Sequence, residues 1–246
     1  MKLALLQPCL IPDLYYIAAI KKADKVIISS DDNWSRKGRT NRFLVRTNSS
    51  LHWLTWPILT EDKKKKISIL FEEIMNVMGL DLEDDSLRGT PDRVAKMYID
   101  EIFSGLNPKN KPKIALFDNK YQYNQMLVEK NITFYSNCEH HFVPIIGKAH
   151  VAYISSGKVI GLSKLNRIVQ YYAKRPQVQE RLTNQIGEEL KKILGTDDVA
   201  VIIDAKHLCV SSRGIKDESS ATVTAYYSGA FNSSAKIAEL NNYIKS

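Results

Sequence analysis

The sequence predicts an α+β fold with antiparallel strand pairing, and three observations lead to this prediction. Helix-forming patterns come first, in residues 67–80 and 90–105. β-rich segments follow them, and a pair of helical segments is inserted between strands instead of one helix alternating with each strand. Because regular alternation of strand and helix is typical of parallel sheets, this clustering favours an antiparallel sheet with helices packed on it.

The first two helices are indicated by apolar periodicity and by their ends. In residues 67–80, apolar side chains recur at intervals of three and four, and Gly79 closes the pattern. The next helix is expected to begin at Thr90-Pro91, where a hydroxyl cap precedes a proline at the first helical position. Val94, Met97, Tyr98 and Ile102 then share one face, and Gly105 is expected to end this helix.

The rest of the chain reads as strands with one helix pair between them. The predicted strands are 127–135, 148–154, 199–205 and 222–227, and the predicted helices are 163–174 and 178–194, separated by Arg175-Pro176. Ahead of all these, residues 25–29 read as a buried strand, and the charged run 61–66 makes a plausible boundary. We therefore expect an N-terminal extension over 1–60 and a domain over 61–246.

Composition places the chain among ordinary globular proteins. It has 246 residues, 44% apolar and 25% charged, which argues against wholesale disorder, a collagen-like chain and a disulfide-dense miniature domain. No apolar run reaches the roughly 18 residues of a membrane span, and Gln7 and two prolines interrupt the short apolar start, so neither a membrane partner nor a secretory signal is expected. Three cysteines are a sparse, odd set that fits a reducing, cytoplasmic location.

The net charge of +8 is spread along the chain, and Lys63–Lys66 is the one dense basic run. Nucleic-acid-binding proteins usually concentrate their positive charge, so no nucleic-acid partner is expected. The weaker inference is an attraction for polyanionic ligands, including phosphates.

A cluster of cysteine and histidine is the strongest chemical signal. Cys138 and His141 are three residues apart in the run CEHH (138–141), and Cys209 follows much later. Two thiolates and one imidazole leave the fourth tetrahedral position open, as catalytic zinc requires. His207 and Cys209 are two apart in a β-rich stretch, so their side chains are expected to face the same way.

The plainer interpretation is that these thiols are small buried apolar residues and that the histidines are scattered surface groups. However, three of the five histidines adjoin the two cysteines, and only His52 and His150 lie elsewhere. This clustering favours a metal site. Glu139, between candidate ligands, is expected to face outward or to support the ligands without binding metal.

Two helix starts carry candidate ligand-binding residues. Ser163 is expected to cap one helix, whose first N–H groups and dipole attract anions, while Lys164 and Arg167 can grip the same anion. At the other start, next to Gln179, Glu180 can accept two parallel N–H bonds from a guanine edge. The plainer alternatives are solvated cations on a capped helix and an acidic side chain that simply stabilises a first turn. Arg213, four residues after Cys209, brings a further cation near the metal.

Together these residues resemble the GTP cyclohydrolase I family over about residues 61–231. The resemblance rests on four strings: DDSLRGTPDRVAKMYIDEIFSGL (84–106), CEHHFVPIIGKAHVAYI (138–154), GLSKLNRIVQYYAKRPQVQERLTNQI (161–186) and HLCVSSRGIKD (207–217). It implies a tunnelling fold (T-fold), with an antiparallel sheet and helices, here preceded by a helical segment and a short N-terminal extension. It also implies zinc-dependent opening of the guanine ring of GTP to formate and 7,8-dihydroneopterin triphosphate, the first step of folate and pterin biosynthesis.

The resemblance also implies residue roles. Cys138, His141 and Cys209 match the zinc ligands, and His140 and His207 match the catalytic histidines. The implied substrate contacts are Ser163, Gln179 and Glu180, with Glu180 on guanine, and Lys164, Arg167 and Arg213 on the triphosphate, with Arg93 reaching it from a different subunit. Members of the family form decamers of two pentameric rings with shared active sites, so a homodecamer is expected.

Residues 1–60 resemble the opening of the WbqC-like family, at motifs such as Gln7-Pro8, Asp31-Asp32 and Trp53-Leu54-Thr55-Trp56-Pro57. Only the first part of that longer domain would be present, so we expect a truncated remnant without transferable activity. An unrelated extension packing on the core is the alternative. The helical segment usual at the N-terminus of the cyclohydrolase family is expected to be replaced here.

Two other functions stay open on the sequence alone. One is a different T-fold activity on a pterin or deazapurine, such as a nitrile reductase that uses a cysteine nucleophile without zinc; the paired Cys138, His141 and Cys209 argue against it. The other is a basic scaffold or nucleic-acid-binding protein with a structural zinc. That function needs four protein ligands, and the sequence offers three.

Overall fold

The structure, a computed structural model, describes residues 3–6, 25–28, 42–46, 51–55 and 60–245. The chain divides into two compact units, Met1–Lys63 and Lys64–Ser246. Among the described residues, no helix is both long enough and apolar enough to cross a bilayer.

The N-terminal unit contains two strand pairs in its described residues. Strand β1 (Leu3–Leu6) pairs in parallel with β2 (Lys25–Ile28), and β3 (Arg42–Arg46) pairs antiparallel with β4 (Leu51–Thr55). The strand predicted over 25–29 is therefore present, whereas β3 and β4 were not predicted. The motifs at 7–8 and 31–32 lie outside the described residues.

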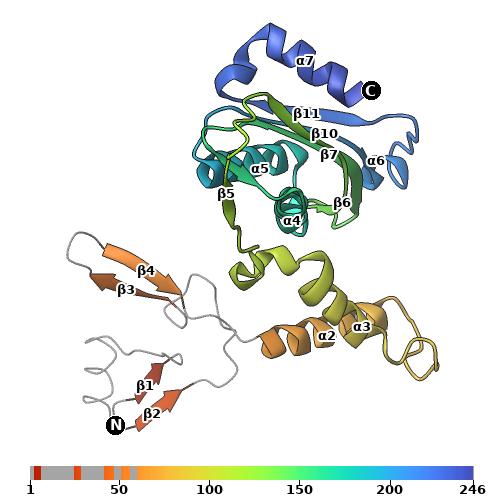
Figure 1. The fold of residues 1–246 in the computed structure, drawn as a ribbon. Coiled ribbons are helices and arrows are strands. Elements are labelled where there is room, and N and C mark those ends of the chain that lie inside the picture. The colour runs from red at the N-terminus through yellow and green to blue at the C-terminus, as the bar shows by residue number, and fades with distance from the viewer. Residues whose placement is uncertain (1–2, 7–24, 29–41, 47–50, 56–59, 246) are drawn as a thin grey trace. The chain divides into compact units, whose positions relative to one another are not determined.

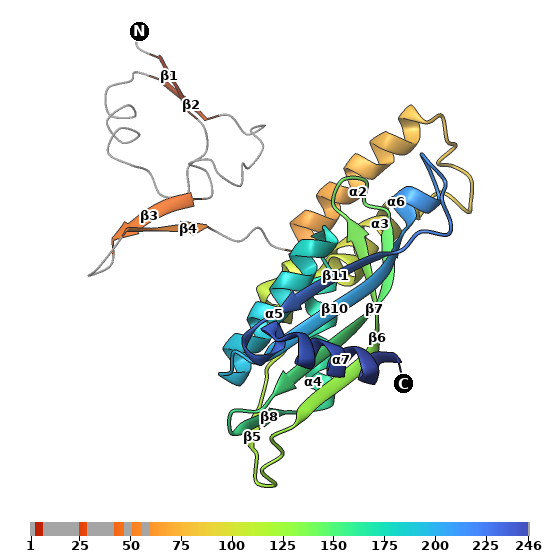
Figure 2. The same cartoon turned by 90° about the horizontal axis from the view of Figure 1, so that it is seen from above.

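The C-terminal unit is built on a five-stranded sheet in the order β11-β10-β7-β6-β9. Its strands are β6 (Met126–Cys138), β7 (Pro144–Ile154), β9 (Pro176–Gln177), β10 (Val199–His207) and β11 (Thr222–Tyr227). Neighbours pair antiparallel except β6 and β9, which pair in parallel. The long strands lie side by side in Figure 2. The prediction of an α+β fold with an antiparallel sheet is confirmed.

Two helices cover one face of this sheet and a third covers the other (Figure 1). Helices α4 (Leu162–Ala173) and α5 (Gln179–Leu194) lie on one side, and α7 (Ser234–Lys245) lies on the opposite side. Strand β10 shows why both faces are covered, because successive strand residues point to opposite faces. Val199, Val201 and Ile203 belong to the core with α4 and α5, whereas Ala200 packs with Leu240 of α7.

The helices predicted at 163–174 and 178–194 match α4 and α5 closely. The separator predicted at Arg175-Pro176 leads into β9, whose Pro176 and Gln177 pair with Asn137 and Cys138 at the end of β6. This pairing places the start of α5 next to the β6–β7 loop.

The helical segment ahead of the sheet begins earlier than its apolar pattern. Helix α2 spans Thr60–Val77, so it includes the charged run expected to form a boundary. It ends at Val77, two residues before Gly79, which adopts a left-handed backbone with φ of +73°, a conformation that costs glycine little.

The second helical segment differs from the prediction at both ends. Helix α3 spans Thr90–Lys96 and is capped by Gly89, so Thr90 is not its cap; its hydroxyl instead accepts a hydrogen bond from Arg93 Nη2 at 2.7 Å. The chain continues as a π-helix, η1 (Met97–Ile102). Gly105 lies beyond η1, where its N–H donates to Lys174 O at 2.9 Å and a Cβ would lie 2.1 Å from Tyr171 O.

Short elements complete the unit. These are η2 (Ser104–Leu106), η3 (Pro108–Asn110), the antiparallel pair β5 (Leu116–Asp118) and β8 (Lys158–Ile160), α6 (Leu208–Ser211) and η4 (Gly229–Asn232). Helix α6 directly follows β10 and carries one of the candidate ligands.

Candidate metal centre and active site

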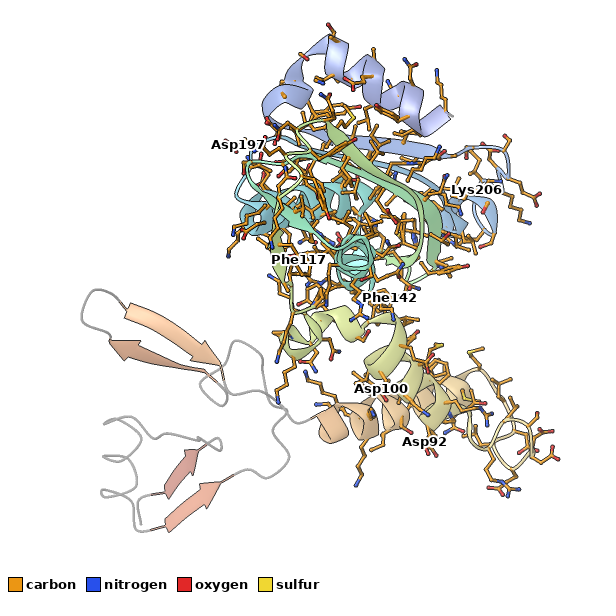
Figure 3. The ribbon with its side chains drawn as sticks, viewed as in Figure 1. Asp92, Asp100, Phe117, Phe142, Asp197 and Lys206 are labelled. Atoms are coloured by element: carbon orange, nitrogen blue, oxygen red, sulfur yellow. The ribbon has the colours of Figure 1, made fainter. Side chains whose placement is uncertain are left out.

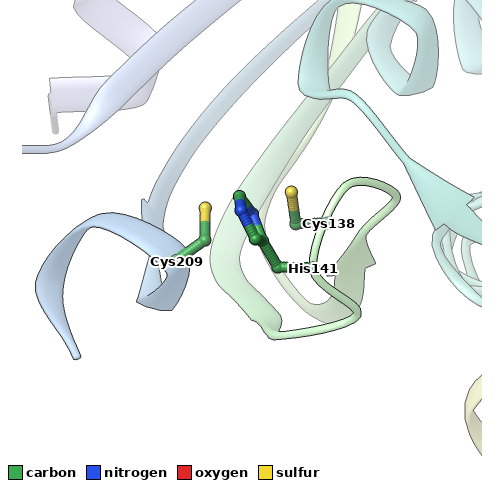
Figure 4. Close-up of side chains that lie close together, drawn as sticks. All are labelled: Cys138, His141 and Cys209. Atoms are coloured by element: carbon green, nitrogen blue, oxygen red, sulfur yellow. The ribbon is translucent and has the colours of Figure 1, made fainter. Parts of the chain in front are cut away.

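Cys138, His141 and Cys209 converge at one end of the sheet, as Figure 4 shows. Their ligand atoms all lie within 4.8 Å of one another. Small side-chain rotations would bring them within reach of one ion whose bonds to sulfur and nitrogen measure about 2.0–2.3 Å. Two soft thiols with one imidazole suit zinc better than magnesium or calcium, which prefer oxygen. The donor set therefore fits a zinc ion.

The loop between β6 and β7 holds two of the three side chains. Cys138 ends β6 and is 5% exposed, and its N–H donates to Val143 O at 2.9 Å. Phe142 has a left-handed backbone with φ of +55°, and its N–H donates to Cys138 O at 2.8 Å. Asn137 Nδ2 donates to Phe142 O at 2.9 Å. These bonds close the loop tightly around His141, which is itself exposed.

The ring of Phe142 attaches this loop to the helical segment. It lies 5.2 Å from the Phe103 ring and 6.5 Å from the Tyr98 ring, between centroids. Figure 3 shows Phe142 where the helical segment meets the sheet. A left-handed backbone is costly for a bulky residue, so these packing and hydrogen-bond contacts stabilise the conformation that the loop needs.

Cys209 reaches the cluster from a different element than expected. The sequence predicted an extended strand through His207 and Cys209, but β10 ends at His207 and Cys209 lies in the short helix α6. The expectation that alternation along a strand makes the two side chains face the same way is therefore wrong. Burial raises the pKa of the Cys209 thiol, and the neighbouring Cys138 raises it further, while Arg213 acts in the opposite direction.

His207 lies beside the first residue of α5. Its Nε2 is 2.7 Å from Oε1 of Gln179, a residue that is 2% exposed. Burial lowers the pKa of His207, and the nearby Glu180 carboxylate partly offsets this effect. Because its pKa falls below the ordinary value of about 6.5, His207 is mainly neutral at pH 7.

The two residues between Cys138 and His141 have different surroundings. His140 Nδ1 lies 3.7 Å from Cys138 Sγ, so this imidazole adjoins the cluster. Glu139 pairs with Arg181 of α5, which also donates to Pro176 O at 3.0 Å. The hydrogen bond from Arg181 lowers the pKa of Glu139. Glu139 thus contacts helix α5, in agreement with its predicted supporting position.

The start of α4 presents its cations without the predicted cap. The helix begins at Leu162 after Gly161, so Ser163 lies inside the first turn, and no side-chain hydrogen bond caps this helix. Ser163 and Arg167 are exposed and Lys164 is half-buried. Among the described residues, no hydrogen bond or ion pair joins these three to the metal cluster.

The two remaining arginines lie on different elements. Arg213 follows α6 and is exposed, close enough to influence the charge on Cys209. Arg93 is an exposed residue of α3 whose Nη2 donates to Ser86 O at 2.7 Å. The structure thus gathers Cys138, His141 and Cys209, with His140 next to Cys138. His207 ends β10, two residues before Cys209, and Arg93 lies on the helical segment.

Several supporting residues had no signal in the sequence. The left-handed backbone of Phe142 follows no glycine or asparagine pattern, and the Glu139–Arg181 pair spans 42 residues. The polar partners of Gln179 likewise come from β10 and β11. Only the register of the folded sheet brings such groups together.

Comparison with known proteins points to one family. Residues 67–244 match the model of GTP cyclohydrolase I. A GTP cyclohydrolase 1 of Flavobacterium johnsoniae is 64% identical over 219 residues, covering 89% of this chain and 98% of that protein. The GTP cyclohydrolases 1 of Pectobacterium carotovorum and Citrobacter koseri are 57% and 58% identical over 174 residues, covering 71% of this chain and 79% and 78% of theirs.

The N-terminal resemblance is confirmed as well. Residues 7–73 match the model of the WbqC-like protein family. The 219 residues aligned with the Flavobacterium relative exceed the length of segment 61–246, so part of the first 60 residues is shared with that relative.

The α+β architecture, the antiparallel sheet and the Cys/His cluster agree with these matches. The matching family model covers well over half of the chain. The relatives are identical to this chain at more than half of the aligned positions, and the alignments cover most of their own length. The chain belongs to the GTP cyclohydrolase I family.

Proposed function

We propose that this chain hydrolyses GTP by opening the imidazole ring of guanine. Carbon C8 leaves as formate, and the ribose rearranges and closes a new ring to give 7,8-dihydroneopterin triphosphate, the first step of folate and pterin biosynthesis. The observation that carries this proposal is the convergence of Cys138, His141 and Cys209. Cys138 pairs with Gln177, two residues before α5, and His207 contacts Gln179 at the start of α5.

The proposed cofactor is Zn²⁺, held by Cys138, His141 and Cys209. When bound, zinc supplies a Lewis acid that makes water a nucleophile near neutral pH. The burial of Cys138 and the hydrogen bonds that close the β6–β7 loop fix the positions of its two ligands before any ion arrives. Three protein ligands leave the fourth tetrahedral position for water or a reacting group.

His207 and His140 are the proposed proton carriers. An imidazole that is neutral at pH 7 can take a proton from an attacking water and return it to a nitrogen as a C–N bond of the purine breaks. The lowered pKa of His207 supports this role, because the neutral form is the one that accepts the proton. His140 is the second such group, next to Cys138.

The proposed substrate contacts surround this centre. Glu180, exposed at the start of α5, is assigned to the guanine edge, and Ser163 and Gln179 complete that part of the site. The triphosphate is assigned to Lys164, Arg167 and Arg213, with Arg93 contributed by a neighbouring subunit. Binding the triphosphate far from C8 orients the base, and orientation alone can lower a barrier substantially.

The proposed organisation is a catalytic domain over 61–246 with an accessory extension over 1–60, in a cytoplasmic homodecamer of two pentameric rings. Large apolar side chains on the outside of α2 support assembly, because Ile74 is 51% and Val77 is 89% exposed. Neither nucleic acid nor a membrane is a proposed partner.

The test is to incubate purified protein with GTP and to measure formate together with the fluorescent oxidised pterin. We expect both products to form, to disappear after treatment with a chelator and to return when zinc is added. Full turnover in a zinc-free preparation, or no formate from the zinc-loaded protein, would contradict the proposal. Binding to duplex DNA that weakens steeply with salt would instead favour the basic scaffold.

A further inference from the structure

The side-chain amide of Gln179 already makes polar contacts within the protein at both its nitrogen and its oxygen. Its Nε2 lies 2.8 Å from Thr222 O, 3.1 Å from Thr224 Oγ1 and 3.2 Å from Ile203 O. Its Oε1 lies 2.7 Å from His207 Nε2. Both ends of the amide are thus engaged by other residues of the same chain.

The orientation of this amide follows from its partners. Main-chain carbonyls accept hydrogen bonds and never donate them, so the amide nitrogen must face Thr222 O and Ile203 O. Two hydroxyls reinforce this orientation. Thr183 Oγ1 donates to Gln179 O at 2.8 Å, and the Thr183 and Thr224 hydroxyl oxygens lie 2.7 Å apart. Thr224 therefore donates to Thr183 and is left to accept from Gln179.

The orientation of the amide in turn decides the state of His207. Oε1 of Gln179 is an acceptor only, so His207 Nε2 must carry a hydrogen to make the 2.7 Å contact. In a neutral imidazole the other nitrogen, Nδ1, then holds the free lone pair. Within residues 60–245, no hydrogen bond is made to Nδ1.

We propose that Gln179 is a positioning residue that holds His207 in the Nε2–H tautomer and thereby leaves Nδ1 as the nitrogen available to the reacting groups. The hydrogen bond from Nε2–H to Oε1 of Gln179 fixes the orientation of the imidazole ring. This inference rests on the proposed function, and it replaces the side-chain contact with substrate that the family resemblance implied for Gln179.

The direct test is the tautomer of His207 in the zinc-loaded protein. Solid-state NMR of protein with ¹³C,¹⁵N-labelled histidine resolves five side chains, and the signal missing from a His207→Gln variant identifies His207. We expect the neutral ring to be protonated on Nε2 in the wild type. Protonation on Nδ1, or an equal mixture of both tautomers, would overturn the inference.

Kinetics of Gln179→Met separate positioning from substrate binding. Methionine has a similar volume and offers no comparable acceptor, so the single tautomer should be lost. We expect kcat to fall by about 10²-fold while KM for GTP changes by less than about threefold. A rise in KM with kcat unchanged would show instead that Gln179 binds substrate.

Two further variants keep the test decisive. Gln179→Glu places a carboxyl among carbonyl oxygens, where it takes the protonated form, donates to them and still presents an acceptor to His207. In this variant the tautomer of His207 and the value of kcat should lie closer to the wild type than they do in Gln179→Met. Gln170→Met is the matched control, because the Gln170 amide donates to Thr133 O at 2.6 Å and has no contact with His207. Its kcat should stay near the wild-type value.

The two proposals fail in different ways. If the zinc-loaded wild type releases no formate, the proposed function is wrong whatever the NMR shows. If formate is released but His207 carries its hydrogen on Nδ1, the function stands and the role of Gln179 is wrong.

Discussion

Helices α2 and α5 have the same kind of apolar periodicity and opposite surroundings. On α5, Leu182, Ile186 and Leu190 are fully buried against the sheet. On α2, Met75 is buried, but much of the apolar surface faces outward: Ile69, Leu70, Ile74 and Val77 are 47%, 48%, 51% and 89% exposed. Periodicity therefore identifies the apolar face of a helix but not what covers it. The chain itself covers α5, and we infer that another copy covers α2.

Introducing a charged residue into the apolar face of each helix gives the largest expected effects, on folding for α5 and on assembly for α2. Ile186→Asp buries an unpaired carboxylate and should cost about 4 kcal/mol or more, enough to unfold a marginal domain. Ile74→Asp places the same charge on the exposed face of α2 and should leave the helical content unchanged while reducing the size of the assembly. Circular dichroism and analytical ultracentrifugation measure the two effects. Unfolding by Ile74→Asp with no change in assembly would contradict the comparison.

Removal of one candidate ligand, Cys209 of α6, tests the metal site next to α5. Cys209→Ser should lose the metal and reduce formate release by about 10³-fold or more, because the Lewis acid is lost. The fold should persist, since Cys209 is only half-buried. Metal analysis and the formate assay measure both effects. Cys9→Ser, which removes the one cysteine outside the cluster, is the control and should retain metal and activity.

A buried histidine of the sheet predicts how stability depends on pH. His150 is 8% exposed, and burial lowers its pKa, with Lys130 and Lys148 acting in the same direction and Asp204 opposing them. The unfolded chain, with a pKa of about 6.5, therefore binds this proton more readily than the folded one. Stability should fall as the pH drops below about 6.5, by at most about 1.4 kcal/mol per pH unit for this group.

Denaturant unfolding from pH 7.5 to 5.5 measures this slope, and His150→Gln should reduce it. His207, with its pKa lowered in the same direction, contributes to the slope that is left. An equal slope in wild type and variant would show that His150 carries no part of it.

The smallest effect concerns the exposed side of α5. Arg181→Gln removes the partner of Glu139 and should let the pKa of that carboxyl rise toward its ordinary value. The metal loop is then held less firmly, and zinc affinity should fall by about tenfold or less in chelator competition. Lys191→Gln also breaks an ion pair of α5, with Asp197, and should leave zinc affinity unchanged.

The sequence predicted helices and strands with local signals well, and it predicted contacts between residues far apart in the chain poorly. Strand β11 coincides with the predicted 222–227, and α4 and α5 lie within one or two residues of their predicted bounds, because periodicity and Pro176 are local signals. The Thr90 and Ser163 caps failed because Gly89 and Gly161 take the cap positions one and two residues earlier. Hydroxyl side chains favour a cap, but the chain entering the helix decides which residue has the required backbone.

The candidate site shows the same difference between what local patterns predict and what depends on distant residues. Residue type and spacing were enough to name Cys138, His141 and Cys209, whereas the short helix that carries Cys209 was expected to be a strand. The bonds of Gln179 to carbonyls of β10 and β11 depend on how the sheet and α5 pack. Such contacts join residues far apart in the sequence, and no local pattern encodes them.

X-ray absorption at the zinc edge of the purified protein tests the central claim most directly. One zinc per chain should show two sulfur neighbours at about 2.3 Å and two nitrogen or oxygen neighbours at about 2.0–2.1 Å, and Cys209→Ser should contain no bound zinc. A zinc shell without sulfur, or protein that opens GTP with no bound metal, would contradict it.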